Sequence, residues 1–409
     1  MIETLLKEAK DACRSFQLVK KEAKINALQA IKEALVANTS SIIEANQKDI
    51  ENAKQQGMKE SMIDRLLLDE SRILEIADGV LRVSQLDDPI GQVIRSIERP
   101  NGLKIQQVRI PIGTVGVVYE ARPNVTVDIA AICIKTNNVC ILKGGKEAFY
   151  SNQALCQIMQ EAIQPYLPVN PIYMIEKMDH AVVTELICDR DHVDVVIPRG
   201  GKGLIQHVVK NAKVPVIETG AGLCHLYVDQ YANIDMALKI AQNAKIQRPS
   251  VCNAIETILV HEKVAQSFLT QLKPLFTKIK IYGDEASLKY IEGELATKEN
   301  YATEYDDYIC NIKVVKDVQE AIEHIYQYST KHSECIVTEN EEEAIYFMDA
   351  LDSACVYHNA STRFTDGGQF GFGAEVGIST QKLHARGPIG LQEMTSTKYK
   401  IFGHGQIRK

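Results

Sequence analysis

From residue 113 onward, short apolar runs alternate with segments long enough to form helices. The first series of apolar runs occupies residues 115–119, 139–143, 172–175, 193–197 and 214–217. The second series occupies residues 226–228, 256–260, 279–282, 312–315, 334–337 and 354–357. Strands separated by helix-length gaps are typical of βαβ units, whose parallel strands form one sheet. The sequence therefore predicts an α/β protein with two domains, parallel-type sheets and a boundary near residue 222.

The first 95 residues and the last 15 follow other patterns. Apolar residues such as Leu28, Ile31 and Leu35 recur at helical spacing near the N-terminus. The segments 93–99 and 103–109 alternate on either side of an Asn-Gly pair, which favours a β-hairpin. The tail at 395–407 alternates again. We therefore predict domains at 1–222 and 223–387, and a small β-arm in which 93–109 pairs with 388–409.

Charge and cysteine content exclude several classes of function. The formal charge of −7 argues against nucleic acid as the main partner, because phosphate backbones need a basic surface. No apolar stretch is long enough to span a bilayer, and the N-terminus lacks a secretory core, so we expect a cytoplasmic protein without a membrane partner. The ten cysteines are dispersed without a CxxC pair, so we expect neither disulfides nor a metal site.

One cysteine has the setting of a nucleophile. Cys252 follows Pro249 and Ser250, which end the preceding helix and leave room for a carbonyl group, and a buried strand follows it. Upstream, the run at 214–217 leads to Glu218 and a glycine-rich turn. This pairing of a strand-end acid with a loop cysteine resembles the aldehyde dehydrogenase superfamily, and implies its two-domain fold with an oligomerisation arm.

Four further segments are similar to one branch of that superfamily. They are 248–254 (RPSVCNA), 321–325 (AIEHI) followed by 328–334 (YSTKHSE), 361–368 (STRFTDGG) and 383–390 (LHARGPIG). They resemble the gamma-glutamyl phosphate reductases, also called glutamate-5-semialdehyde dehydrogenases. The resemblance implies NADPH-dependent reduction of L-glutamyl 5-phosphate to L-glutamate 5-semialdehyde and phosphate, in proline biosynthesis, through a Cys252 thioester. The domain at 1–222 would then bind the cofactor, and the domain at 223–387 would carry the cysteine.

The resemblance also assigns roles to Asn124 and Glu218. Asn124, in Arg122-Pro123-Asn124, matches the asparagine that donates to the carbonyl oxygen with the cysteine's backbone N–H. The alternative is that Asn124 caps the following helix. For Glu218, a catalytic role and a positioning role stay open, because water activation would waste a thioester needed for reduction. We expect His324 and His332 to be structural.

The nucleotide site lacks the usual GxGxxG fingerprint. By resemblance, Lys143 would contact the adenosine ribose. Lys146 stands where NAD-preferring relatives carry an acid, so Coulomb attraction predicts a preference for NADP(H); the alternative is a solvated surface lysine. Arg199, Gly200 and Gly201 lie between a strand and a helix and could meet the pyrophosphate, although a plain turn explains them equally well.

The substrate is an anion, so arginines inside the motif segments are candidate ligands. Guanidinium forks match carboxylate and phosphate geometry, but any one of these arginines could instead form a structural ion pair. The substrate-binding candidates are Arg122, Arg248, Ser250, Arg363 and Arg386.

Rival interpretations are two other kinds of enzyme and a protein without catalytic activity. A hydrolytic NAD(P)-dependent aldehyde dehydrogenase would use Glu218 as its general base and would not need phosphate. A non-catalytic paralogue would keep the fold alone; a cysteine hydrolase is weaker, because no histidine stands in an obvious partner position. We expect a small-molecule substrate and a homo-oligomer, dimer or tetramer. The sequence leaves open whether the upstream glutamate kinase associates with it.

Overall fold

The computed structural model describes residues 2–179 and 181–408, which form two compact units. Unit 1 runs to Thr219 and includes Gly371–Gly377 and the stretch from Ile389 onward. Unit 2 comprises Gly220–Phe370 and Ile378–Pro388. Residues 371–377 therefore lie in unit 1, whereas the sequence pattern grouped them with the second domain. That the two units serve cofactor and chemistry stays a prediction.

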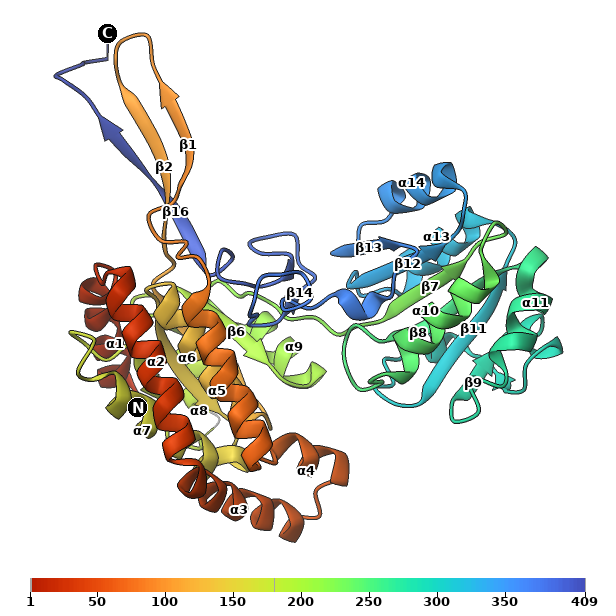
Figure 1. The fold of residues 1–409 in the computed structure, drawn as a ribbon, viewed down its shortest axis with the longest axis horizontal. Coiled ribbons are helices and arrows are strands. Elements are labelled where there is room, and N and C mark those ends of the chain that lie inside the picture. The colour runs from red at the N-terminus through yellow and green to blue at the C-terminus, as the bar shows by residue number, and fades with distance from the viewer. Residues whose placement is uncertain (1, 180, 409) are drawn as a thin grey trace. The chain divides into compact units, whose positions relative to one another are not determined.

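Unit 1 is built on a parallel sheet with the order β5-β4-β3-β6 (Figure 1). Its strands are β3 (Thr114–Tyr119), β4 (Val139–Gly144), β5 (Ile172–Met174) and β6 (Val195–Arg199). The helical segments between and after them are α6 (Pro123–Lys135), η1 (Lys146–Ala148), α7 (Phe149–Ile163), α8 (Ala181–Cys188) and α9 (Lys202–Asn211). Every residue of β3 and β4 is buried, as expected for a parallel sheet covered on both faces.

The strand predicted at 214–217 is reduced to a single bridge between Val196 and Val216. Pro215 accepts a hydrogen bond from the Val196 N–H at 2.9 Å but has no N–H of its own to extend a ladder. The other predicted strands of this series are present.

Helices precede this sheet, as the periodicity predicts. They are α1 (Glu3–Phe16), α2 (Lys21–Ala37), α3 (Thr39–Gln55), α4 (Glu60–Leu66) and α5 (Glu70–Gln85). The buried stripe of α2, which includes Leu28, Ile31 and Leu35, packs against α5 and α7. These helices therefore belong to unit 1 and contribute buried apolar side chains to its core.

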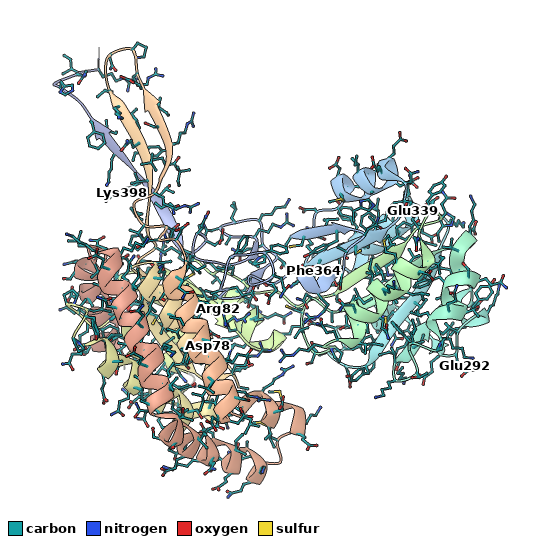
Figure 2. All side chains as sticks on the ribbon, viewed as in Figure 1. Asp78, Arg82, Glu292, Glu339, Phe364 and Lys398 are labelled. Atoms are coloured by element: carbon teal, nitrogen blue, oxygen red, sulfur yellow. The ribbon has the colours of Figure 1, made fainter. Side chains whose placement is uncertain are left out.

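The β-arm is a three-stranded antiparallel sheet with the order β1-β2-β16. The strands are β1 (Val93–Glu98), β2 (Lys104–Pro111) and β16 (Thr395–Phe402). Figure 1 shows the three strands side by side, and Lys398 is labelled on β16 in Figure 2. The predicted pairing of the hairpin with the C-terminal tail is confirmed.

Unit 2 contains a seven-stranded parallel sheet with the order β10-β9-β11-β8-β7-β12-β13. Its strands are β7 (Cys224–Val228), β8 (Ile255–His261), β9 (Lys280–Gly283), β10 (Glu294–Leu295), β11 (Ile309–Val315), β12 (Ser333–Val337) and β13 (Cys355–His358). Two helices pack on one face, α10 (Ile234–Ile246) and α11 (Glu262–Leu272), and two on the other, α13 (Val318–Tyr328) and α14 (Glu341–Ala350). Shorter elements are η2 (Ser287–Lys289), α12 (Lys298–Tyr301), η3 (Thr362–Phe364), β14 (Ile378–Ser379) and β15 (Gly387–Pro388). The α/β fold class is confirmed.

Candidate active site

Cys252 lies in a turn between the end of α10 and the start of β8. Its side chain is neither fully buried nor fully exposed, unlike Cys310 and Cys335, which are buried inside strands. Because the sheet is parallel, the amino ends of β7, β8 and β12 lie at one edge. The turn thus places the thiol at the edge where these strands begin.

Hydrogen bonds hold each carbonyl of this turn from Val251 to Asn253. The Val251 oxygen accepts from the Ala254 N–H at 2.9 Å, and the Cys252 oxygen accepts from the Cys224 thiol at 3.1 Å. The Asn253 oxygen accepts from the Thr362 hydroxyl at 2.7 Å. A turn held at three consecutive carbonyls can present a side chain in one direction, as a nucleophile requires.

Gly222 packs directly against the backbone of Cys252. A Cβ at this position would overlap the Cys252 carbonyl group and stand 2.6 Å from its Cα. The Gly222 N–H donates to the Glu304 carboxylate at 2.6 Å. The glycine-rich turn after Glu218 carries no sequence signal of this contact, because it joins segments that are distant in the chain.

Two arginines of the motif segments, Arg363 and Arg248, lie near one another in the region of Cys252. The Arg363 guanidinium donates to the Gln247 side chain at 3.1 Å and to the side-chain oxygen of Asn253. Burial lowers the pKa of Arg363, the nearby Arg248 lowers it further, and Cys252 raises it. The Arg363 guanidinium therefore lies close enough to Cys252 for the two groups to interact electrostatically.

In unit 1, Asn124 lies in the first turn of α6. Pro123 occupies the first helical position and Arg122 is the N-cap residue, so the capping alternative for Asn124 is wrong. The Asn124 amide instead donates to the Asp128 carboxylate at 2.9 Å. An amide has two N–H donors and this bond uses one.

The carboxyl ends of β3 and β6 form the candidate cofactor end of unit 1. In the order β5-β4-β3-β6 the chain runs outward from β3 on one side and then crosses to the other, which makes β3 the switch point. Nucleotides bind at such points in open parallel sheets. Glu120, after β3, accepts a hydrogen bond from the Gly201 N–H at 2.8 Å, where α9 begins. This N–H therefore already binds an anionic oxygen.

Lys143 and Lys146 lie at the carboxyl end of β4 and just beyond it. The Lys143 ammonium is buried and donates to the Gly144 carbonyl at 2.8 Å, and burial lowers its pKa. Lys146 is exposed in η1. The neighbouring Glu147 accepts from the Ala121 N–H at 2.6 Å. The Glu147 carboxylate is thus held by a backbone N–H, and the exposed charge of this segment is the ammonium group of Lys146.

Glu218 and Arg122 also belong to unit 1. Glu218 is half-buried and follows the bridge at Val216, and Arg122 is exposed. The three predicted catalytic residues are therefore divided between units, Asn124 and Glu218 in one and Cys252 in the other. Their convergence on one substrate stays a prediction.

Comparison with known proteins decides the family. Residues 1–309 match the model of the aldehyde dehydrogenase family. The gamma-glutamyl phosphate reductase of Clostridium novyi (strain NT) is 53% identical over 406 residues, covering 98% of this chain and 97% of the relative. The crystal structure of the gamma-glutamyl phosphate reductase from Thermotoga maritima matches with a TM-score of 0.97 and 45% identity over 100% of both chains. The chain belongs to the gamma-glutamyl phosphate reductases, within the aldehyde dehydrogenase family.

Solved structures with much lower sequence identity share the fold of this reductase. An engineered glycolyl-CoA reductase with bound NADP⁺ matches with a TM-score of 0.72 and 14% identity, covering 98% of this chain and 96% of the other. No helix among residues 2–179 and 181–408 is long and apolar enough to cross a membrane.

Arg386 of this reductase forms an ion pair within unit 2, and its role in substrate binding stays a prediction. Its guanidinium donates to the Asp352 carboxylate at 2.9 Å and to the Asp352 backbone oxygen at 2.7 Å. Lys382 and Lys331 also contact Asp352, and these cations hold the pKa of its carboxyl well below the usual range. Ser250 is half-buried in the turn before Cys252.

His324 and His332 are buried in unit 2 of the reductase. Burial lowers the pKa of His324 to about 2 and that of His332 to about 4. Both rings are therefore neutral at physiological pH, which supports a structural interpretation over acid–base chemistry.

The Asp128→Asn variant should change how the stability of the reductase depends on pH. Burial raises the pKa of Asp128 from 3.8 to about 6, although Arg199 and Arg82, labelled on α5 in Figure 2, oppose the shift. A raised carboxyl pKa means that the folded state loses stability as pH rises from about 4 to about 6. Asparagine cannot ionise, so the melting temperature of the variant relative to wild type should increase between pH 4 and pH 7.

Thermal unfolding at several pH values checks this expectation. Asp78→Asn, at an exposed position of α5, is the matched control. A melting-temperature difference for Asp128→Asn that stays constant or falls with pH would contradict it.

Proposed function

We propose that this reductase converts L-glutamyl 5-phosphate and NADPH into L-glutamate 5-semialdehyde, phosphate and NADP⁺, through a thioester on Cys252. The observation that carries the proposal is the Cys252 turn: a partly exposed thiol, held at its backbone and flanked by Arg248 and Arg363. Relatives of that name align along nearly the whole chain, which supports the substrate.

The first step is acyl transfer to Cys252. The thiolate attacks the acyl carbon, a C–S bond forms, and the C–O bond to phosphate breaks as phosphate leaves with the electron pair. Phosphate is a good leaving group, so no acid has to protonate it. Asn124 and the Cys252 N–H would hold the oxyanion during attack, which is often the largest electrostatic contribution in acyl transfer. Arg248 and Arg363 would balance the anionic charge of the substrate.

The second step reduces the thioester. Bound NADPH would supply the hydride. The resulting thiohemiacetal oxyanion would use the same donors as the first step, and its collapse breaks the C–S bond, which releases the aldehyde and returns Cys252 as a thiolate. Glu218 has two candidate roles, moving a proton or positioning groups. Activating water is not one of them, because hydrolysis would consume the thioester before reduction.

The residues at the carboxyl ends of the unit 1 strands have the chemistry to bind NADP(H). Gly200 and Gly201 lack side chains where α9 begins, and the Gly201 N–H already holds a carboxylate oxygen. These residues would hold the pyrophosphate after Glu120 moves away, and Arg199 lies beside them. Lys143 would contact the ribose, and Lys146 would attract the 2′-phosphate.

The Lys146→Glu variant should lose much of its preference for NADPH. Reversing an exposed charge near a dianionic phosphate should lower the ratio of kcat/KM for NADPH to that for NADH by about tenfold or more. Steady-state kinetics with both cofactors measure the ratio, with Lys7→Glu on α1 as an exposed control. An unchanged ratio would mean that Lys146 does not read the 2′-phosphate.

Phosphate dependence tests the proposed reaction. The assay follows NADP⁺ reduction by glutamate 5-semialdehyde with and without inorganic phosphate. We expect turnover that requires phosphate, because phosphate is the acyl acceptor in reverse. Equal rates without phosphate would show that water resolves the thioester, and the hydrolytic aldehyde dehydrogenase would be the better interpretation.

We also propose that the β-arm joins copies of this chain into a dimer or tetramer. Its solvent-facing side chains include large apolar groups, among them Ile94, Tyr399, Ile401 and Phe402. Exposed apolar strands of this kind are usually covered by a partner. We propose a cytoplasmic location as well, in line with ten cysteines that are dispersed along the chain without a CxxC pair.

A further inference from the structure

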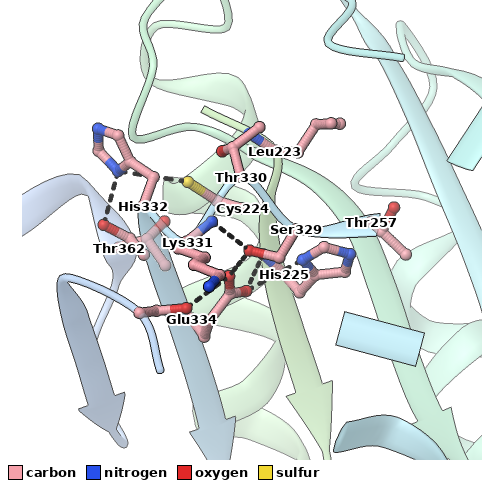
Figure 3. Close-up of polar contacts among 12 residues, drawn as sticks. Leu223, Cys224, His225, Thr257, Ser329, Thr330, Lys331, His332, Glu334 and Thr362 are labelled. Carbon is pink, nitrogen blue, oxygen red and sulfur yellow. Dashed lines mark hydrogen bonds and ion pairs between the residues drawn. The ribbon is translucent and has the colours of Figure 1, made fainter. Parts of the chain in front are cut away.

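The motif at 328–334 (YSTKHSE) lies beside the Cys252 turn without belonging to it. β12 begins at Ser333 and pairs with β7, so this motif meets the segment that contains Gly222 and Cys224. The Leu223 N–H donates to the Thr330 hydroxyl at 3.0 Å. Figure 3 shows Cys224 and His332 pointing toward one another from these neighbouring elements. The motif therefore borders the residue that touches the Cys252 carbonyl.

Cys224 is fully buried, and its thiol donates to the Cys252 carbonyl at 3.1 Å. Burial raises the pKa of Cys224 well above its usual value, and the nearby Glu334 and Cys252 raise it further. The Cys224 thiol therefore keeps its proton across the working pH range. It is a permanent donor and not a second nucleophile.

His332 also contacts the Cys224 thiol. Its Nδ1 lies 3.7 Å from the Cys224 sulfur and 2.9 Å from the Ser333 hydroxyl. The ring is neutral, because burial lowers its pKa to about 4. The hydrogen of the Cys224 thiol is directed at the Cys252 carbonyl, so the sulfur is left to accept in its contact with His332. The contact is therefore satisfied when the ring proton of His332 is on Nδ1. The Ser333 hydroxyl continues to the Thr365 hydroxyl at 2.7 Å, and the Thr365 carbonyl holds Asn253 at 2.9 Å.

Two consecutive peptide groups are fixed on either side of the Cys252 Cα. The bond from Ala254 to the Val251 carbonyl fixes the plane that contains the Cys252 N–H, because the peptide unit is rigid. The bond from Cys224 fixes the plane of the next peptide. With both planes set, the backbone dihedral angles of Cys252 are set, and so are the directions of its N–H and of its Cα–Cβ bond, from which the thiol extends.

We propose that Cys224 is a positioning residue for the reductase reaction: by holding the Cys252 carbonyl, it aims the Cys252 thiol and N–H at the substrate carbonyl. This inference rests on the proposed function, since it assumes that Cys252 is the nucleophile. It assigns the motif at 328–334 the task of orienting Cys224. Substrate binding itself does not involve Cys224.

The test compares Cys224→Ala with Cys335→Ala. Cys335 is equally buried and its thiol also donates to a backbone carbonyl at 3.1 Å, but that carbonyl belongs to Ala360, outside the Cys252 turn. The two variants lose the same atoms, so their melting temperatures should fall together. Only Cys224→Ala should lose kcat, by about tenfold or more, with KM within about twofold of wild type, because misaimed groups slow the chemical step.

Restoring a donor should restore the rate. Cys224→Ser keeps a hydroxyl that can reach the Cys252 carbonyl, so we expect it to recover most of the kcat that alanine loses. The proposal is overturned if Cys224→Ala keeps the wild-type kcat, if Cys335→Ala loses as much, or if serine is as slow as alanine. Wild-type protein that fails to turn over would instead overturn the proposed function.

Discussion

The Cys252→Ala variant should lose reductase activity while it continues to bind NADPH. Removing the nucleophile of a covalent mechanism leaves no group to displace phosphate, so kcat should fall by ~10⁴-fold or more. Cys252 lies in unit 2 and the candidate cofactor residues lie in unit 1, so binding should be unaffected. NADPH oxidation measures the first effect, and NADPH fluorescence titration measures the second.

Cys310→Ala is the control for this prediction. Cys310 is buried in β11 and its thiol donates to the Asn311 carbonyl, not to the Cys252 turn, so its replacement should change stability more than rate. Turnover by Cys252→Ala at a rate near that of wild type would refute the thioester mechanism. Loss of NADPH binding would show instead that this residue supports the structure of the cofactor site.

The Gly222→Ala variant should displace the catalytic turn. The added methyl group would overlap the Cys252 carbonyl group, and a backbone group cannot swing aside as a side chain can. The turn must move by the order of an ångström, which should lower kcat by about 100-fold. The Cys224 bond to the Cys252 carbonyl would be lost with the same movement. Kinetics together with thermal unfolding measure both consequences.

Gly79→Ala separates a general glycine effect from this one. Gly79 lies inside α5, and a Cβ there would meet only the end of the Arg82 side chain at 3.6 Å. Alanine is the better helix former, so this variant should keep its activity and gain some stability. If Gly222→Ala behaved in the same way, the close approach of Gly222 to Cys252 would not matter for catalysis.

Local patterns made most of the fold predictable. Strand runs such as 139–143 and 256–260 are continuous and apolar because parallel strands are buried on both faces. The sequence pattern does not predict β10, because both of its residues are exposed and a strand of two residues has no periodicity. The segment 214–217 has the composition of a strand, but the proline limits its pairing to one bridge.

The site was predictable only as far as single segments allow. Cys252 is identifiable from its own neighbours. Its contacts with Gly222 and Cys224, and the pairing of Arg386 with Asp352, join residues far apart in the chain, so no local pattern reveals them. The position of Asn124 inside the helix could be predicted from the local sequence. Proline favours the first helical position, so Pro123 already indicates that Arg122 is the N-cap residue.

A rapid-mixing experiment tests the Cys252 thioester most directly. The enzyme is mixed with glutamate 5-semialdehyde and NADP⁺ without phosphate, and NADPH absorbance is followed. The mechanism predicts a burst of about one NADPH per Cys252, then a stall that ends when phosphate is added. Steady NADPH production without phosphate, or the absence of any burst, would contradict it.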